Sequence, residues 1–343
     1  MVFHLGVLCL LAERQMLEKV QRISTVSGGS LLVGLILKEA GMTWPSSDQF
    51  ISAVYPSLRR KLCERSLQWG AARQLLRPWN WRYLLSRANL LALALQREWG
   101  ITATLSVVPP SPEWSINGTT AENGKRFRFK HDTIGDYTLG YAAPGDFSLA
   151  SAIAVSAAFP GGFGPLALDT TEFQWRKRPM WDAPAEDERS VDIGYRLLHL
   201  YDGGVYDNLG LEPFFDAGKG KPKHSGEIIV VSDAGAPLKT GFSLISLNPA
   251  RFKRVADIMS DQSRALRVRS FPNYIQQEPL RGAYLYINTP VSGAVGCDSA
   301  SFAANFPTTL RRLLLSEFDA ISDHGYRVAL QVESLYGLVG SPR

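Results

Sequence analysis

The chain has 343 residues, of which 45% are hydrophobic and 20% charged, a composition that can bury a large core and excludes disordered, collagenous and coiled-coil proteins. Its 37 Lys and Arg against 32 Asp and Glu give a formal net charge of +5, and no nucleic-acid-binding motif accompanies this mild excess, so we expect no nucleic-acid partner. The three widely spaced cysteines support neither a disulfide framework nor a zinc cluster, which favours a reducing compartment.

The first hundred residues are predicted to be mainly helical around one short strand. An apolar helix opens the chain, and residues 22–26 form a β-rich strand that turns sharply at Ser27-Gly28-Gly29 into a helix over 30–40. Residues 46–100 carry apolar repeats with interleaved tryptophans and arginines, and we expect them to form a helical cap over the site. No apolar stretch approaches the roughly 20 residues that cross a bilayer.

From Trp114 onward the pattern changes to strands alternating with helices. Ser148 is predicted to cap an alanine-rich helix that stops before Pro160-Gly161-Gly162. The remaining predictions are a hairpin of 114–117 with 126–129, a polar excursion over 170–193, strands at 197–201 and 227–232, and helices at 252–269 and 308–323. This alternation predicts an α/β fold with a largely parallel central sheet between helical layers, in a single domain over residues 1–343.

The turn at Thr25-Val26-Ser27-Gly28-Gly29 is the strongest local signal for chemistry. A serine between a strand and a helix points its hydroxyl outward, beside the positively polarised helix start. The common motif G-x-S-x-G has a glycine two residues before the serine, where this chain has Thr25. The pattern leaves two interpretations open, a nucleophilic Ser27 and a serine that only caps the helix.

A second signal is Tyr201-Asp202-Gly203-Gly204, which ends an apolar strand with an acid and two glycines. Active sites of α/β sheets gather at strand ends, and glycines permit unusual backbone angles. Asp202 alone would also fit a turn-forming role. The two segments together are far more specific, and we expect Ser27 and Asp202 to meet in the folded protein.

These segments resemble the patatin-like phospholipases, a family of serine acyl hydrolases with a Ser-Asp dyad, over nearly the whole chain. Residues 25–30 resemble the family's nucleophile elbow, and Asp202-Gly203-Gly204 with Asn208 resembles its D-G-G-x-x-x-N segment. The stretch Ser156-Ala157-Ala158-Phe159-Pro160, with Phe163 and Pro165, is similar to the family's segment between these two motifs. Weaker agreement comes from Trp114, Ile116, Asn117 and Thr119, and from His324-Gly325-Tyr326. The resemblance implies a patatin-like three-layer α/β/α fold.

The same resemblance implies that Ser27 is the nucleophile and Asp202 the base in the hydrolysis of lipid acyl esters. The glycines it assigns to the site are Gly28 and Gly29 as oxyanion donors and Gly203 and Gly204 in the loop that holds the acid. An aspartate in water is a weak base, so the mechanism requires partial burial that raises the pKa of Asp202. Water would then hydrolyse an acyl-enzyme on Ser27.

The chain departs from the family pattern at its start. Family members carry a glycine-rich loop and a basic residue just before the first helix, and the loop amides form the oxyanion hole; here that loop would lie before Met1. Loss of one oxyanion donor lowers turnover by about a hundredfold to a thousandfold. We therefore hypothesise a truncated or wrongly assigned start. The first alternative function is accordingly a catalytically impaired or silent lipid- or membrane-binding protein.

A further alternative is an α/β-hydrolase-type esterase with a triad of Ser27, Asp202 or Asp233, and His324. That fold lays down several strands before its nucleophile, for which this chain has little room. We interpret His324 as a polar residue before a helix-ending Gly325. Asp233, at the end of the 227–232 strand, competes with Asp202 as the base.

The expected partner is a phospholipid or another lipid ester, with peripheral contact at a membrane. The histidines are scattered without a carboxylate cluster, so we expect no metal and no organic cofactor. The chain shows no secretory signal, which favours a cytoplasmic location, peripheral at a membrane. The oligomeric state is left open.

Overall fold

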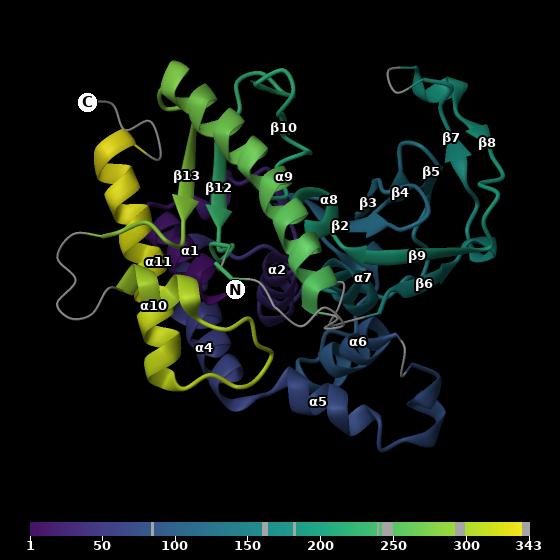
Figure 1. The fold of residues 1–343 in the computed structure, drawn as a ribbon, viewed down its shortest axis with the longest axis horizontal. Helices are drawn as coiled ribbons and strands as arrows, with labels where there is room; N and C mark the ends of the chain where they lie inside the picture. Colours follow the sequence, from purple (N-terminus) through teal and green to yellow (C-terminus); the bar gives the residue numbers. More distant parts are fainter. Residues whose placement is uncertain are drawn as a thin grey trace.

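The structure is a computed structural model that describes residues 1–83, 86–159, 164–180, 183–238, 240–241, 250–291 and 299–337 (Figure 1). The helices of these residues are α1 (Val2–Glu13), α2 (Gly28–Glu39), α3 (Ser47–Gln49), α4 (Tyr55–Glu64), α5 (Leu67–Gln74), α6 (Arg87–Glu98), α7 (Leu149–Ser156), α8 (Gly204–Asp207), α9 (Ala250–Gln277), α10 (Ser299–Asn305) and α11 (Leu315–Tyr336). The strands are β1 (Arg22–Thr25), β2 (Glu113–Thr120), β3 (Arg126–Phe129), β4 (Ile134–Asp136), β5 (Gly140–Ala142), β6 (Leu166–Asp169), β7 (Arg176–Lys177), β8 (Arg189–Ser190), β9 (Leu197–Asp202), β10 (Phe215–Asp216), β11 (Lys221–Pro222), β12 (Ile229–Asp233) and β13 (Gly282–Tyr286). The predicted mixture of helices and strands is confirmed.

The main sheet of the described residues has nine strands, in the order β6-β9-β2-β3-β4-β5-β7-β8 with β1 beside β2. Within it only β1 and β2 pair in parallel, and β12 and β13 form a separate parallel pair. The largely parallel central sheet predicted from the sequence was therefore wrong for these strands. The reason is that β2 to β5 follow one another through connections of a few residues, which permit only antiparallel neighbours.

Two strands share one edge of β2 and meet end to end beside Asn117. β1 runs parallel to β2 and ends with Thr25 opposite Ile116. β9 runs antiparallel to β2 and ends with Asp202 opposite Gly118. Because the two strands approach from opposite directions, the residues that follow them emerge at the same point of the sheet.

Helices α2 and α7 pack against each other and against the strands that meet at this point. α2 is buried along its whole middle, from Ser30 to Leu37, as its continuous apolar sequence predicts. The Ser148 hydroxyl caps α7 by accepting the amide N–H of Ser151, which confirms the predicted cap. The predicted stop at Pro160-Gly161-Gly162 lies outside the described residues, and α7 ends earlier, at Ser156.

The segment predicted as a helical cap is helical. It comprises α3 to α6, a π-helical stretch at Phe50–Val54 and the 3-10 helix η3 (Pro78–Tyr83). α3, the π-helical stretch and α4 pack on α1, α2 and α11, whereas α5 packs on α6 and α6 packs on α7, and α5 and α6 are seen below the sheet in Figure 1. Its role as a cap over the site stays a prediction.

The polar excursion predicted at 170–193 extends the main sheet. β7 pairs with β5 and with β8, and the two short strands form the arm at the upper right of Figure 1. At the other side of the molecule, the β12–β13 pair lies between α9 and α11. The helices predicted at 252–269 and 308–323 correspond to α9 and α11; α9 extends beyond the predicted bounds at both ends, whereas α11 begins later, at Leu315, and continues to Tyr336.

Gly325 was predicted to end a helix, but it lies inside α11. A Cβ atom on Gly325 would lie 2.1 Å from the backbone oxygen of Phe3 in α1. The glycine is therefore explained by the close approach of two packed helices rather than by a helix end. The adjacent His324 is buried in the same interface.

Candidate active site

Ser27 lies at a sharp turn between β1 and α2. Its backbone angles are φ 51° and ψ −119°, in a region that residues other than glycine rarely adopt. A nucleophile elbow has this arrangement, in which a strained turn projects the serine hydroxyl away from the sheet. The predicted sequence of strand, tight turn and helix is confirmed.

A chain of hydroxyl groups holds this turn in place. The Ser27 amide donates to the backbone oxygen of Ser156 at 2.9 Å and to its hydroxyl at 3.1 Å. The Ser156 and Ser30 hydroxyls share a 2.8 Å hydrogen bond, and those of Ser30 and Thr25 share another of 2.8 Å. The indole N–H of Trp114 donates to the Thr25 hydroxyl at 2.8 Å. Since Thr25, Ser30, Ser156 and Trp114 are all buried, the network gains strength from its low-dielectric surroundings.

Asp202, the last residue of β9, is only 2% exposed. Its amide donates to the backbone oxygen of Ala158 at 3.1 Å, and its backbone oxygen accepts the Thr119 hydroxyl at 2.8 Å. The carboxylate oxygen Oδ1 accepts the Gly204 amide at 2.7 Å, and the Ser27 side chain lies near enough to the carboxyl group to lower its pKa by hydrogen bonding. The two side chains that the sequence singled out therefore come together.

Burial raises the pKa of Asp202 to about 7. Desolvation penalises the charged carboxylate, and the hydrogen bonds from Gly204 and Ser27 offset only part of that penalty. Among the described residues, no cationic side chain forms an ion pair with Asp202. A carboxyl group with a pKa near neutrality is a much better proton acceptor at neutral pH than an ordinary aspartate.

Gly203 and Gly204 lie in the loop that follows Asp202, where neighbouring atoms leave no space for a side chain at either position. A Cβ atom on Gly203 would lie 2.4 Å from the backbone oxygen of Asn117. On Gly204 it would lie 2.8 Å from Oδ1 of Asn208 and 3.1 Å from Oδ1 of Asp202. The loop therefore requires both glycines to keep the Gly204 amide on the carboxylate.

The two predicted oxyanion donors lie at the first turn of α2. The Gly29 amide already donates to the backbone oxygen of Val26 at 2.9 Å. Within the described part of the chain, no acceptor takes the Gly28 amide, which lies at the positive end of the α2 dipole. Of the two glycines, Gly28 is therefore the one whose amide is available to a developing oxyanion.

Asp233, the competing acid, lies in different surroundings at the end of β12. Its Oδ2 accepts Nε of Arg264 at 3.0 Å and the Tyr284 hydroxyl at 2.5 Å, and its Oδ1 accepts the Gly235 amide at 2.8 Å. The acceptor positions of this buried carboxylate are filled by donors of its own sheet and of α9. The geometry favours a structural role for Asp233.

His324, the histidine of the triad alternative, lies in α11. Its Nε2 is hydrogen bonded to the backbone oxygen of Ile287 at 2.6 Å, and its ring lies 5.9 Å from that of Phe3. A triad requires the imidazole to bond both the serine and the acid. Among the described residues no hydrogen bond joins His324 to Ser27 or Asp202, so the arrangement does not support the triad.

Comparison with protein families agrees with this geometry. The family model described as patatin-like phospholipase matches residues 1–215, which is more than half of the chain. The chain belongs to the patatin-like phospholipase family. The matched segment contains both members of the patatin-like Ser27–Asp202 pair, whereas Asp233 and His324 lie beyond it. Comparison with curated proteins finds no match.

Sequence reasoning assigned no individual role to Ser156 or Asn117 of this patatin-like chain. Asn117 donates its side-chain amide to the Ser24 hydroxyl and to the backbone oxygen of Thr25, both at 2.9 Å, and so ties β2 to the end of β1. Both residues stand in stretches that resemble the family, and no spacing in the sequence marks them. Their contacts cross from one element to another, so only the folded chain reveals them.

No group of three or more His, Cys, Asp or Glu side chains in the described ranges is arranged to hold a metal ion. Of the helices described above, none combines the length and the hydrophobicity that crossing a bilayer requires.

Proposed function

We propose that this patatin-like chain is a serine lipid acyl hydrolase, a phospholipase or esterase, that acts through a Ser27–Asp202 dyad. The observation that carries the proposal is the placement of Ser27, at the turn after β1, beside the buried carboxyl group of Asp202, whose pKa it lowers by hydrogen bonding. A serine hydroxyl becomes an effective nucleophile only when a neighbouring base takes its proton. The pKa of Asp202, raised to about 7 by burial, suits that base at neutral pH.

The first half of the reaction would form an acyl-enzyme. The Ser27 oxygen attacks the ester carbonyl carbon while its proton passes to the Asp202 carboxylate. The negative charge on the former carbonyl oxygen is stabilised by the Gly28 amide at the start of α2. When the carbon–oxygen bond to the leaving alcohol breaks, Asp202 returns the proton to that alcohol.

The second half would regenerate the enzyme. Asp202 accepts a proton from a water molecule, whose oxygen attacks the acyl carbon. The bond to the Ser27 oxygen then breaks, and Asp202 donates the proton back to Ser27. The products are a free fatty acid and the alcohol released in the first half, and no cofactor takes part in either step.

The direct test is hydrolysis of a short-chain p-nitrophenyl ester and of phosphatidylcholine by the purified chain and by Ser27→Ala. We expect the parent to release p-nitrophenol and fatty acid and the variant to lose this activity by about a thousandfold or more. A Ser106→Ala variant, which changes an exposed serine in the 3-10 helix η4 (Leu105–Val107), serves as the matched control. Equal rates in the parent and Ser27→Ala would remove the proposal.

Peripheral membrane contact is proposed to occur through the segment from α5 to η3. Four large apolar side chains of this segment are exposed, namely Trp69 (67%), Leu76 (81%), Trp79 (65%) and Trp81 (59%). The arginines exposed among them are Arg65, Arg73, Arg77 and Arg82. Tryptophan favours the membrane interface and arginine favours anionic headgroups, so this surface fits a membrane that contains anionic lipid.

Co-sedimentation with phosphatidylglycerol vesicles tests this surface. We expect Trp79→Ser to weaken vesicle binding and to leave hydrolysis of the soluble p-nitrophenyl ester unchanged, because Trp79 lies outside the dyad. Vesicle binding equal to that of the parent would contradict the assignment. A parent chain that binds vesicles but hydrolyses neither ester would instead establish the silent lipid-binding alternative.

A further inference from the structure

Two arginines of β3 belong to the face of the sheet opposite the dyad. Along β3, Phe127 and Phe129 are buried, and the half-buried Arg126 and Arg128 alternate with them. Phe127 pairs with Gly118 of β2, and Gly118 pairs in turn with the last residue of β9. Cross-strand partners share a face, so the buried side of β3 is the side of the dyad and the arginines belong to the other side.

Among the described residues, neither arginine forms an ion pair with a carboxylate. Arg126 donates from Nη1 to the side-chain oxygen of Asn117 at 3.2 Å, and burial together with the charge of Arg128 lowers the pKa of Arg126. Arg128 lies over the ring of Tyr141, 4.2 Å from its centroid, and its buried Nε has no hydrogen-bond acceptor. In the part of the chain that the structure describes, no carboxylate lies within salt-bridge distance of either guanidinium.

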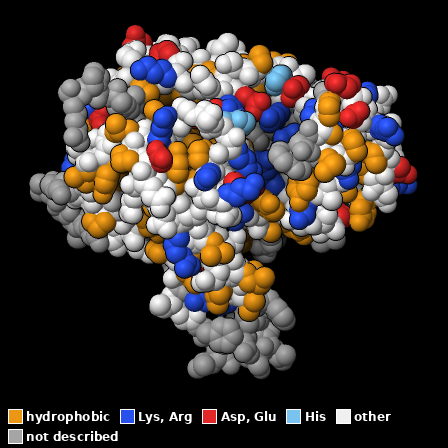
Figure 2. Space-filling model, turned by 90° about the horizontal axis from the view of Figure 1, so that it is seen from above, with side chains coloured by type: hydrophobic (Ala, Val, Ile, Leu, Met, Phe, Trp, Pro, Cys, Tyr) orange, Lys and Arg blue, Asp and Glu red, His pale blue; other side chains and the backbone are white. Residues whose placement is uncertain are grey.

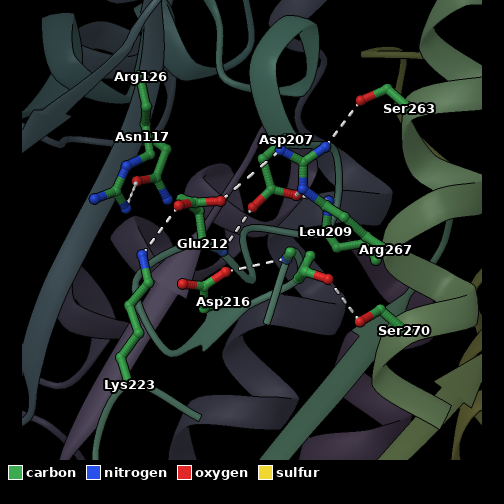
Figure 3. Close-up of polar contacts among 12 residues, drawn as sticks. Asn117, Arg126, Asp207, Leu209, Glu212, Asp216, Lys223, Ser263, Arg267 and Ser270 are labelled. Carbon is green, nitrogen blue, oxygen red and sulfur yellow. Dashed lines mark hydrogen bonds and ion pairs between the residues drawn. The ribbon is translucent and has the colours of Figure 1, made fainter. Parts of the chain in front are cut away.

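Two acids of this neighbourhood, Asp207 and Glu212, are matched by other cations (Figure 3). Asp207 and Glu212 raise the pKa of Arg126 by electrostatic attraction, but neither forms an ion pair with it in the described residues. Arg267 lies 3.4 Å from Asp207 and 3.9 Å from Glu212, and Lys223 donates to Glu212 at 3.0 Å. These two acids and two cations pair with one another, so that among the described residues Arg126 and Arg128 have no ion-pair partner.

We infer that Arg126 and Arg128 form a binding site for a phosphoryl group, free in solution or carried by a lipid headgroup. The planar guanidinium presents paired N–H donors that match phosphate oxygens. A phosphate monoester carries about two negative charges at neutral pH, which equals the charge of the two arginines. Figure 2 shows Lys and Arg side chains gathered near the middle of the face that is seen from above.

The anion site does not depend on the proposed hydrolysis. It involves neither Ser27 nor Asp202, so a Ser27→Ala chain should bind phosphate as the parent does. Failure of the anion site would leave ester hydrolysis unaffected, and failure of hydrolysis would leave phosphate binding unaffected. The two proposals are therefore tested separately.

The test is titration of the Ser27→Ala chain with inorganic phosphate at constant ionic strength, followed by calorimetry and by the melting temperature. We expect phosphate to bind and to raise the melting temperature, whereas chloride at equal ionic strength does not. Arg126→Gln and Arg128→Gln should each weaken phosphate binding by about tenfold or more. Arg196→Gln, which removes an exposed arginine with only a 4.0 Å contact to Asp169, is the charge-matched control and should bind as tightly as the parent.

A second measurement keeps the test valid if an arginine contributes to folding. Because each arginine is half-buried without an anion, we expect the phosphate-free melting temperature of Arg126→Gln and Arg128→Gln to equal or exceed that of the parent. If either variant melts far below the parent in phosphate-free buffer, the arginine stabilises the fold without a bound anion, which would contradict the proposed site. Absence of phosphate binding by the parent, or equal binding by all variants, would overturn the site.

Vesicles distinguish the two sources of the phosphoryl group. Phosphatidylcholine vesicles with and without phosphatidic acid are compared for the Ser27→Ala chain, alone and with Arg128→Gln. Loss of the phosphatidic-acid-dependent binding in the double variant assigns the site to a lipid headgroup. Vesicle binding that is unchanged while phosphate binding is lost assigns it to a soluble phosphate.

Discussion

Asp202 and Asp233 are two almost fully buried aspartates that each end a β-strand, and their surroundings differ in one respect. Asp233 bonds Arg264, Tyr284 and the Gly235 amide, so its charge is matched. Among the described residues, the Asp202 carboxyl group accepts the Gly204 amide and lies beside the Ser27 side chain but forms no ion pair, and its pKa rises to about 7 because desolvation outweighs these contacts. A buried carboxyl group without a cation is costly to keep charged, and that cost makes it a proton acceptor near neutral pH.

The largest expected effect is on catalysis, and it should appear at only one of the two acids. Asp202→Asn removes the proton acceptor and should lower kcat/KM for the p-nitrophenyl ester by about a thousandfold to ten-thousandfold. Asp233→Asn, an equally buried strand-end acid, is the matched control, and its folded fraction should retain activity within a few-fold of the parent. Loss of activity in Asp233→Asn alone would reverse the assignment of the base.

At Asp233 the expected effect is on stability, through its ion pair with Arg264. Arg264→Leu leaves a buried carboxylate without its cation and should lower the free energy of unfolding by about 3 to 5 kcal/mol. Urea denaturation monitored by tryptophan fluorescence measures this loss. If Arg264→Leu unfolds at the same urea concentration as the parent, the Asp233 pair does not stabilise the fold.

The pH dependence of stability should distinguish Asp202 from an ordinary aspartate. Burial raises the pKa of Asp202 in the folded chain to about 7, above its value near 4 in the unfolded chain, so the folded state holds a proton more tightly between these values. This group therefore costs no stability below about pH 4, lowers stability as the pH rises toward 7, and has a constant cost of a few kcal/mol above it.

Asp202→Asn removes that cost. The variant should exceed the parent in free energy of unfolding at pH 8 and should lose the advantage at pH 4 to 5, as measured by urea denaturation at both pH values. A difference between the two chains that is the same at pH 4.5 and pH 8 would show that the Asp202 pKa is not raised in the folded chain.

The pH dependence of catalysis depends on the same group. Ionisation of Asp202 lowers stability but is required for activity. Only the ionised Asp202 can accept the Ser27 proton, so kcat/KM should fall about tenfold per pH unit below the pKa near 7 and level off above it. Initial rates with the p-nitrophenyl ester between pH 5 and pH 9 provide the profile. A rate that is constant from pH 5 to pH 9 would contradict Asp202 as the base.

The smallest effect is expected at the hydroxyl network behind Ser27. Ser156→Ala removes the hydroxyl that links the Ser27 amide to Ser30 and Thr25, but it keeps the 2.9 Å bond from the Ser27 amide to the Ser156 backbone. We expect a loss of about 1 kcal/mol in stability and a severalfold decrease in kcat with little change in KM. An increase in KM alone would indicate that the network contacts the substrate instead of positioning the turn.

The sequence indicated which residues meet at the candidate site better than it indicated the architecture that joins them. Ser27, Asp202 and the two glycines after Asp202 could be selected because turns and strand ends carry local signals. The end-to-end meeting of β1 and β9 beside Asn117 could not, since it depends on register and on strand direction. The alternation of strands and helices suggested parallel pairing, whereas the short connections from β2 to β5 impose antiparallel pairing.

Departures from the expected pattern also became clear only in the fold. Thr25 occupies the position where G-x-S-x-G has glycine, and its hydroxyl is bonded to Ser30 and to the Trp114 indole. Gly325 permits the close contact of α1 with α11. In the sequence alone, such a glycine looks the same as a glycine that ends a helix. In both cases the decisive contact joins elements that are far apart along the chain.

The most direct test of the Ser27–Asp202 dyad is covalent labelling with a fluorophosphonate, followed by mass mapping of the modified peptide. The parent and Asp233→Asn should be labelled at Ser27, and Asp202→Asn should be labelled far more slowly because its serine has no proton acceptor. Label on another serine, or an equal labelling rate of Ser27 in Asp202→Asn and the parent, would contradict the dyad.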